Sequence, residues 1–141
     1  MVQLIVGKKG KGKTKCLLDK VNTEVKNVLG SVAFLDKNTK HMYELNNKIR
    51  LIVVSDFMIS NSDEFIGFVS GIISQDHDLQ QMYFDSFLNI SCLEENIDDM
   101  VSTIEKLEKL SEKFNVDFVL SVSRDESELP EAVKSKVVIS L

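Results

Sequence analysis

Apolar residues along this chain gather in six short runs, which are separated by longer segments of mixed polarity. The runs cover residues 2–6, 31–35, 51–54, 81–84, 117–122 and 137–141. Because these runs are mainly apolar rather than strictly alternating, the pattern predicts strands that are buried on both faces. Strands of this kind are typical of a parallel sheet that is covered by helices on both sides.

Segments between the runs carry apolar residues at helical spacing. After the first run these are Leu17, Leu18, Val21, Val25 and Val28, and Gly30 can end the helix. Asn61 and Glu64 have the spacing of a capping box. The helix that they open ends in the polar sequence QDHD and has an apolar face of Phe65, Ile66, Val69, Ile72 and Ile73.

The longest predicted helix covers residues 96–114. Its apolar stripe consists of Ile97, Met100, Val101, Ile104, Leu107 and Phe114. We expect Glu105 and Lys109 to form an exposed ion pair one turn apart. Two short elements complete the pattern: a helix or turn within residues 37–49, and a brief helix with Pro130 in its first turn.

Strands and helices therefore alternate along the whole chain. This alternation predicts an α/β fold, a three-layer α/β/α sandwich with a mainly parallel sheet of about six strands. At 141 residues the chain is expected to form one domain, 1–141, that is long enough to bury a substantial core.

Composition and charge limit the kinds of molecule that the protein is expected to bind. The chain is 43% hydrophobic and 28% charged, as in ordinary soluble proteins, and its net charge of −5 argues against a general nucleic-acid surface. Residues 1–50 carry 11 Lys and Arg against 4 Asp and Glu, whereas residues 51–141 carry 6 against 18. An anionic ligand is therefore expected in the first part. Two kinds of protein contact also remain possible: a homo-oligomer formed through oppositely charged faces, and an unknown protein partner.

The remaining single residues indicate little special chemistry. Cys16 and Cys92 lack metal or redox spacing and are expected to be buried free thiols. His41 and His77 are isolated and expected at the surface. No apolar run is long enough to span a membrane or to form a signal-peptide core, so we expect a cytoplasmic protein.

Residues 7–14, GKKGKGKT, fit the phosphate-loop pattern G-x-x-x-x-G-K-[ST]. The match follows a predicted strand and opens a predicted helix, which favours a nucleotide site over a solvated basic turn. Backbone N–H groups and the helix N-terminus bind phosphate oxygens in such loops. Lys13 is expected to reach the terminal phosphates, whereas Lys8, Lys9 and Lys11 are expected to face solvent. The candidate nucleotide-binding residues are Gly7, Lys8, Lys9, Gly10, Lys11, Gly12, Lys13, Thr14 and Lys15.

A metal-binding carboxylate is expected at the end of an apolar strand, where it would hold Mg²⁺ together with the hydroxyl of Thr14. Asp85 directly follows QMYF and is the better candidate, although it could also cap an ordinary turn. Asp56 lies one polar residue beyond LIVV and is the weaker candidate. Lys13 and Asp85 are thus the candidate catalytic residues, and Thr14 and Asp85 the candidate magnesium ligands.

The order of these motifs resembles the nucleotide-binding core of the RecA-like P-loop ATPases, which include recombinases, ring helicases and circadian-clock ATPases. The specific matches are GKKGKGKT, AFLD in the second strand and FDS after the fourth. The resemblance implies the strand order six-one-five-four-two-three, with the fifth strand between the loop strand and the Asp85 strand. It also implies that Ser121 or Ser123 senses the terminal phosphate, although serines are common at strand ends.

The chain departs from the family at one position. Family members usually place a water-activating glutamate two residues beyond the aspartate of the AFLD-like strand, and here that position is Asn38. An amide cannot accept a proton, so general-base help is lost. Asp36 is a nearby carboxylate to which the family pattern gives no role. Arg124 either contacts a phosphate or pairs on the surface with Asp125 or Glu126.

Three functions remain open. The leading hypothesis is an ATP-binding protein with weak, Mg²⁺-dependent hydrolysis, a possible ATPase. The alternative, which Asn38 favours, is a non-catalytic nucleotide-sensing or assembly module. A small-molecule phosphotransferase is less favoured, because such enzymes need an arginine-bearing lid. The absence of an N-K-x-D stretch argues against GTP, and no nucleic-acid-binding motif is present.

Overall fold

A six-stranded, all-parallel sheet forms the centre of the molecule. The computed structural model describes residues 1–141. The strands are β1 (Val2–Val6), β2 (Ser31–Asp36), β3 (Ile49–Val53), β4 (Leu79–Phe84), β5 (Asp117–Val122) and β6 (Val137–Ser140). Their order is β3-β2-β4-β5-β1-β6, and every neighbouring pair is parallel. The α/β class and the expected strand order are confirmed.

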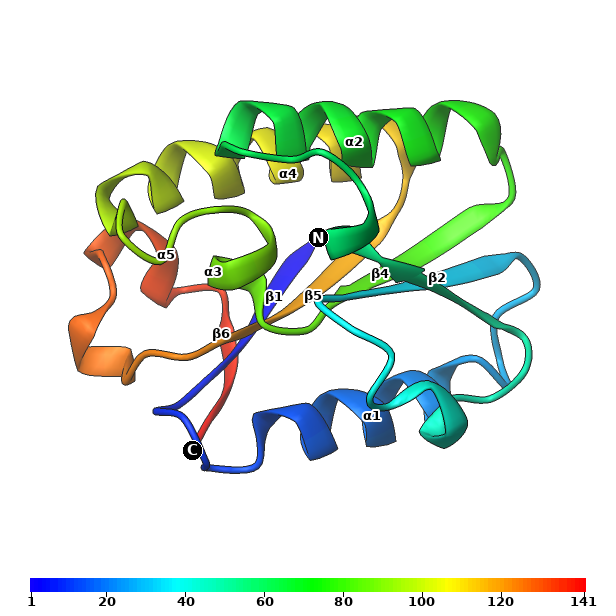
Figure 1. Cartoon of the computed structure of the whole chain (residues 1–141), viewed down its shortest axis with the longest axis horizontal. Coiled ribbons are helices and arrows are strands. Elements are labelled where there is room, and N and C mark those ends of the chain that lie inside the picture. The colour runs from blue at the N-terminus through cyan, green and yellow to red at the C-terminus, as the bar shows by residue number, and fades with distance from the viewer.

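Helices cover both faces of this sheet. They are α1 (Lys13–Glu24), α2 (Ser62–Gln75), α3 (Phe87–Ile90), α4 (Met100–Phe114) and α5 (Glu131–Lys134). Figure 1 shows α1 on one face, and α2 and α4 together on the other. The smaller apolar cluster lies under α1 and includes Ile5, Leu17, Leu18, Val21, Phe34 and Tyr83. The larger cluster lies under α2 and α4 and includes Phe65, Val69, Phe84, Ile104, Leu107 and Phe118. This arrangement is compatible with three layers.

The first helix is shorter than its apolar spacing predicts. It ends at Glu24 rather than near Gly30, and Val28 packs against the α1 cluster from outside the helix. Val25 and Asn27 are weak helix formers, and they follow a helix whose last turn has no basic side chain to interact with its carbonyl groups. Local propensity therefore ends α1 before the glycine does.

Only one of the two hydrogen bonds of the predicted capping box is formed at the start of α2. The Asn61 side chain accepts a hydrogen bond of 2.8 Å from the Glu64 amide, as expected. The Glu64 carboxylate, however, accepts from the amide and hydroxyl of Ser60, both at 2.7 Å, instead of from Asn61. The reciprocal bond is thus displaced by one residue.

Three expectations for α4 were wrong. The helix begins at Met100, after a 3₁₀ turn at Ile97–Asp99, and Phe114 is 47% exposed at its last turn. Ser111 takes the buried position at that level instead. Glu105 and Lys109 form no ion pair. The neighbouring Lys106 instead forms an ion pair with Asp63 of α2 at 2.9 Å.

A buried segment after β4 was missed by the sequence pattern. It contains α3 and carries the buried side chains of Phe87, Leu88, Ile90 and Leu93. The ring of Phe87 stacks on that of Phe84, with centroids 6.1 Å apart. At four residues the helix is too short to show helical periodicity.

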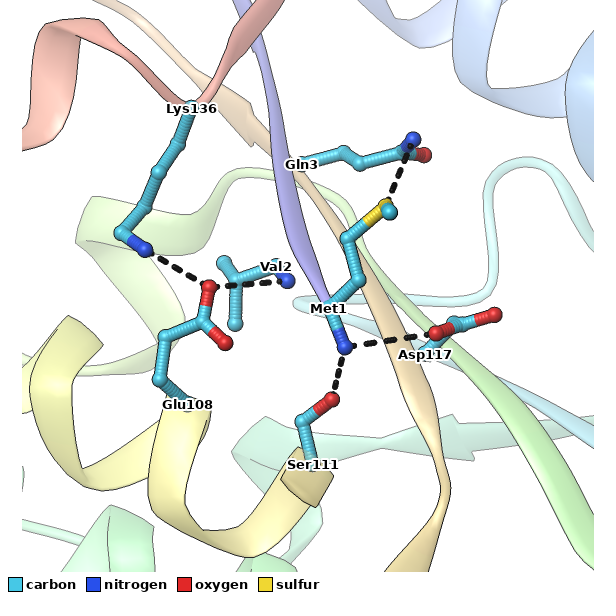
Figure 2. Close-up of polar contacts among 7 residues, drawn as sticks. All are labelled: Met1, Val2, Gln3, Glu108, Ser111, Asp117 and Lys136. Atoms are coloured by element: carbon cyan, nitrogen blue, oxygen red, sulfur yellow. Dashed lines mark hydrogen bonds and ion pairs between the residues drawn. The ribbon is translucent and has the colours of Figure 1, made fainter.

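A polar network joins the amino ends of the strands to α4 and is drawn in Figure 2. One carboxylate oxygen of Glu108 accepts hydrogen bonds from the Val2 amide at 3.1 Å and from Lys136 Nζ at 2.6 Å. The amino group of Met1 donates to Ser111 and to Asp117. Burial opposes the charge of Glu108, but the bonds from Lys136 and Val2 outweigh it and hold the pKa of this carboxyl below its usual range.

Replacement of Glu108 tests this network. Glu108→Gln is expected to lower the free energy of unfolding at neutral pH by about 1–2 kcal/mol, because hydrogen bonds to a charged group are lost. A carboxyl whose folded pKa is depressed stabilises the protein above its unfolded pKa of about 4.3, and this stability is lost as the pH falls through the folded pKa. Urea unfolding should therefore show the wild-type advantage at neutral pH and its disappearance in acid. Glu105→Gln, which is exposed on the same helix, is the control; an acid-resistant difference for Glu108→Gln would contradict the prediction.

Candidate functional site

A polar cavity lies at the carboxyl edge of the sheet. In a parallel sheet all strands end at the same edge, so the segments after β1, β2, β4 and β5 meet there. The cavity has a volume of about 330 Å³, and none of its lining residues is hydrophobic. The lining residues are Lys9, Gly10, Gly12, Lys13, Thr14, Lys37, Lys40, His41, Asp85, Ser86, Ser121 and Ser123. Because basic groups and hydroxyls outnumber its single carboxylate, the cavity suits an anion.

The loop between β1 and α1 forms one wall of the cavity. Gly10 and Gly12 have φ angles of 85° and 93°, in a region that favours glycine. Backbone N–H groups of Gly10, Gly12, Lys13 and Thr14 donate to no protein acceptor. No side chain caps α1, which begins at Lys13. Free amides and an uncapped helix N-terminus are groups with which proteins commonly bind anions.

Lys13 is the buried cation of this loop. Its side chain is only 7% exposed, and its ammonium group donates a hydrogen bond of 3.0 Å to the Lys8 carbonyl oxygen. Burial lowers the pKa of Lys13, while the nearby carboxylate of Asp85 acts in the opposite direction. The lysine therefore lies beside both the loop and Asp85, where a bound anion would compensate for its desolvation.

Asp85 connects the loop to the central strands. It is 3% exposed and accepts hydrogen bonds from the Thr14 hydroxyl at 3.2 and 3.1 Å and from the Ser121 hydroxyl at 2.7 Å. Ser121 in turn accepts a bond of 2.9 Å from the Ser86 amide. The structure thus brings together Lys13, Thr14 and Asp85, although they are far apart in sequence.

A second buried carboxylate ends the neighbouring strand β2. Asp36 is 2% exposed, and one of its oxygens has no hydrogen-bond partner. Burial raises the pKa of Asp36, and the negative charge of Asp85 raises it further. Sequence reasoning gave this residue no role. The sequence pattern that identified Asp85, a carboxylate directly after an apolar run, is nevertheless also present at Asp36.

Other candidate residues lie outside the cavity. The side chains of Lys8, Lys11 and Lys15 are exposed and do not line it, whereas Lys9 is exposed at its rim. Gly7 is buried below the loop, where its amide donates to the Arg124 carbonyl at 2.9 Å.

Two strand-end side chains also lie away from the cavity. Asp56 is exposed in a 3₁₀ turn after β3, so the weaker metal candidate does not belong to the site. Asn38 is exposed too, and its side-chain oxygen accepts a bond of 2.9 Å from the Lys40 amide.

The histidines and cysteines differ in part from expectation. His77 is exposed as expected, but His41 lines the cavity and lies 3.3 Å from the Glu44 carboxylate. Cys16 and Cys92 are free but half-buried rather than buried, and burial raises the pKa of the Cys92 thiol.

Arg124 lies in a hollow that adjoins the cavity, together with Lys9, Lys37 and Ser123. Its guanidinium group donates to the carbonyl oxygens of Ser123 and Glu94, at 3.0 and 3.2 Å. The expected surface pairing with a neighbouring carboxylate is not formed. Arg124 therefore does not line the cavity itself, although its sequence neighbour Ser123 does.

The oxygen ligands in the cavity suit a metal ion that is coordinated by the protein and by a bound anion together. No three His, Cys, Asp or Glu side chains are grouped so that they could hold a metal ion by themselves. Thr14 and Asp85 supply a hydroxyl and a carboxylate within 3.2 Å of each other. Mg²⁺ is commonly bound through one or two carboxylates, with phosphates and water completing its coordination.

No protein-family model matches the amino-acid sequence, and no curated protein is significantly similar to it. No helix has the length and apolar character needed to cross a membrane. The function must therefore be inferred from the geometry and chemistry of the cavity.

The hydrogen bonds of Ser121 give a prediction about stability. Ser121→Ala should lower the free energy of unfolding by about 1–3 kcal/mol, because the partly buried Ser86 amide and the buried Asp85 carboxylate both lose a partner. Ser123→Ala is the matched control, since the Ser123 hydroxyl lines the cavity without a hydrogen bond to the protein. Chemical unfolding of the two variants measures the difference, and equal effects would show that the Ser121 bonds contribute little.

Proposed function

We propose that this chain is an ATP-binding phosphate-loop protein of RecA-like type, with slow Mg²⁺-dependent ATP hydrolysis. The observation that carries the proposal is the meeting of free loop amides, buried Lys13 and the Thr14–Asp85 pair in one polar cavity. Each component is suited to a triphosphate: amides and ammonium to its oxygens, and hydroxyl and carboxylate to its metal ion.

Phosphate binding would exchange one partner of Lys13 for another. In the free protein its ammonium group is bonded to the Lys8 carbonyl, a neutral acceptor. A phosphate oxygen is a stronger, charged acceptor, and the unpaired amides of Gly12 and Thr14 would bind it as well. These groups would stabilise negative charge that develops on the transferred phosphoryl group.

Thr14 and Asp85 would hold Mg²⁺. The ion, when bound, would neutralise charge on the terminal phosphates. Ser121 would keep the Asp85 carboxylate in position through its bond of 2.7 Å.

The strand order supports the RecA-like part of the proposal. Because β5 lies between β1 and β4, its end places Ser121 and Ser123 in the cavity wall. Of these two, Ser121 is already bonded to Asp85, whereas the Ser123 hydroxyl is free. Ser123 is therefore the better candidate for a contact with the terminal phosphate.

Slow turnover is expected because no general base is found where the resemblance places one. Asn38 is an amide, and its exposed side chain is bonded to the local backbone, outside the cavity. The same observation favours a second function, a nucleotide-sensing or assembly module that binds ATP without using it. In that case a second copy or another protein would respond to the bound nucleotide. A phosphotransferase is less favoured, since the guanidinium of Arg124 is occupied by backbone carbonyls.

Nucleotide binding is tested by Lys13→Ala. We expect ATP affinity, measured by calorimetry with Mg²⁺ present, to fall by about 10- to 100-fold, because hydrogen bonds between charged groups are lost. Lys26→Ala removes an exposed lysine beyond the end of α1 and should leave affinity unchanged. A wild-type protein without measurable ATP affinity would refute the proposed function.

The role of position 38 is tested by Asn38→Glu. Because this side chain lies outside the cavity, the new carboxylate should not reach an attacking water, and we expect no gain in phosphate release. A clear rise in turnover would show instead that the missing glutamate limits hydrolysis in the wild-type protein.

A further inference from the structure

Asp36 and Asp85 are placed side by side by the sheet. Strands β2 and β4 are neighbours, and their register pairs Leu35 with Phe84, so the two aspartates follow at the same level. The Asp85 amide donates a hydrogen bond of 2.9 Å to the Leu35 carbonyl, so the two strands are still paired where they end. Neighbouring strands in a sheet are about 4.8 Å apart.

Both aspartates also face the side of the sheet that carries α1. Side chains alternate along a strand, and Phe34 and Tyr83 belong to the apolar cluster under α1, whereas Leu35 and Phe84 belong to the opposite cluster. The next residues, Asp36 and Asp85, therefore return to the α1 side. The contact between Asp85 and Thr14, in the first turn of α1, agrees with this placement.

One oxygen of Asp36 is left without any partner. Its Oδ1 accepts a hydrogen bond of 2.7 Å from the Lys37 amide, but its Oδ2 is fully buried and unpaired. A buried carboxylate oxygen is unfavourable unless a cation or a hydrogen-bond donor satisfies it. Asp36 also interacts electrostatically with Lys37, His41 and Asp85, which all line the cavity.

We propose that Asp36 is the second carboxylate of a divalent-cation site that it forms with Asp85 and Thr14. The inference rests on the proposed function, in which Thr14 and Asp85 hold Mg²⁺. It adds a ligand from a different strand, two residues before the position where the family resemblance expects a carboxylate. Two carboxylates and a hydroxyl leave the remaining positions around the ion for phosphate oxygens and water, which suits Mg²⁺ or Mn²⁺.

The proposal explains why two like charges are buried together. Without a cation the carboxylates repel each other, and the only buried lysine of the loop, Lys13, lies beside Asp85 and is bonded to Lys8. A divalent ion between them would neutralise both charges and give the free oxygen of Asp36 a partner. Because both carboxylates come from the protein, the site should bind the ion even without nucleotide.

Titration of nucleotide-free protein with Mn²⁺ tests the proposal. Calorimetry at neutral pH should give a dissociation constant at least about 10- to 100-fold higher for Asp36→Asn than for wild type, because removing even a hydrogen-bonding partner of a metal ligand typically costs this much affinity. Asp56→Asn is the matched control. It removes the same charge from the end of the adjacent strand β3, outside the cavity, and should bind Mn²⁺ like wild type.

Thermal unfolding gives a second, independent measurement. In EDTA, Asp36→Asn should melt at a higher temperature than wild type, because a repelling, unpaired carboxylate is removed. Excess Mg²⁺ should raise the melting temperature of wild type but raise that of the variant much less, since the stabilisation by a ligand grows with the logarithm of its concentration divided by its dissociation constant. A carboxylate with a merely structural role would lower the melting temperature in both conditions when it is replaced.

Two results would overturn the proposal. Equal Mn²⁺ affinity of wild type and Asp36→Asn would show that Asp36 is not a ligand, while leaving the proposed ATP binding untouched. No Mn²⁺ binding by wild type would exclude a site built from both carboxylates. The proposed function would still be judged by its own ATP titration of wild type and Lys13→Ala, so the two failures can be told apart.

Discussion

The hydrogen bonds that the Asp85 carboxylate accepts hold the site together. One set comes from Thr14, in the first turn of α1, and the other from Ser121, on the central strand β5. Three segments from distant parts of the sequence are thereby fixed at one edge of the sheet. The phosphate-loop helix and the central strand are thus connected through one buried carboxylate. Such a charge is stable only while its hydrogen bonds remain formed.

The cavity favours the charged part of a ligand over its apolar part. None of its lining residues is hydrophobic, and its basic side chains come from the loop and from the segment after β2. Phosphate recognition through amides and lysines is insensitive to the base of a nucleotide. Under the proposed function, selectivity among nucleotides must therefore come from contacts beyond the cavity. Lys9 and Lys37 line both the cavity and the adjoining hollow, whereas the guanidinium group of Arg124 in that hollow is occupied by two carbonyl oxygens.

Much of this arrangement could be predicted from the sequence, because it follows from short-range patterns. The apolar runs located all six strands, and Asp117–Val122 was predicted with its observed bounds. The loop and Asp85 were recognisable because glycines and a carboxylate stand directly beside such runs. What could not be predicted depended on tertiary contacts. Burial of Phe87 and exposure of Phe114 are decided by neighbouring elements, and the side-by-side position of Asp36 and Asp85 follows from strand register.

The network around Glu108 and Lys136 lies at the opposite edge of the sheet from the cavity. Strands of five or six residues separate the two edges by about 17–20 Å, well beyond the distance at which substitutions usually influence one another. Changes at the two edges should therefore combine additively. Substitutions at the amino edge can therefore raise the free energy of unfolding, by selection or by engineering, without altering the chemistry of the carboxyl edge.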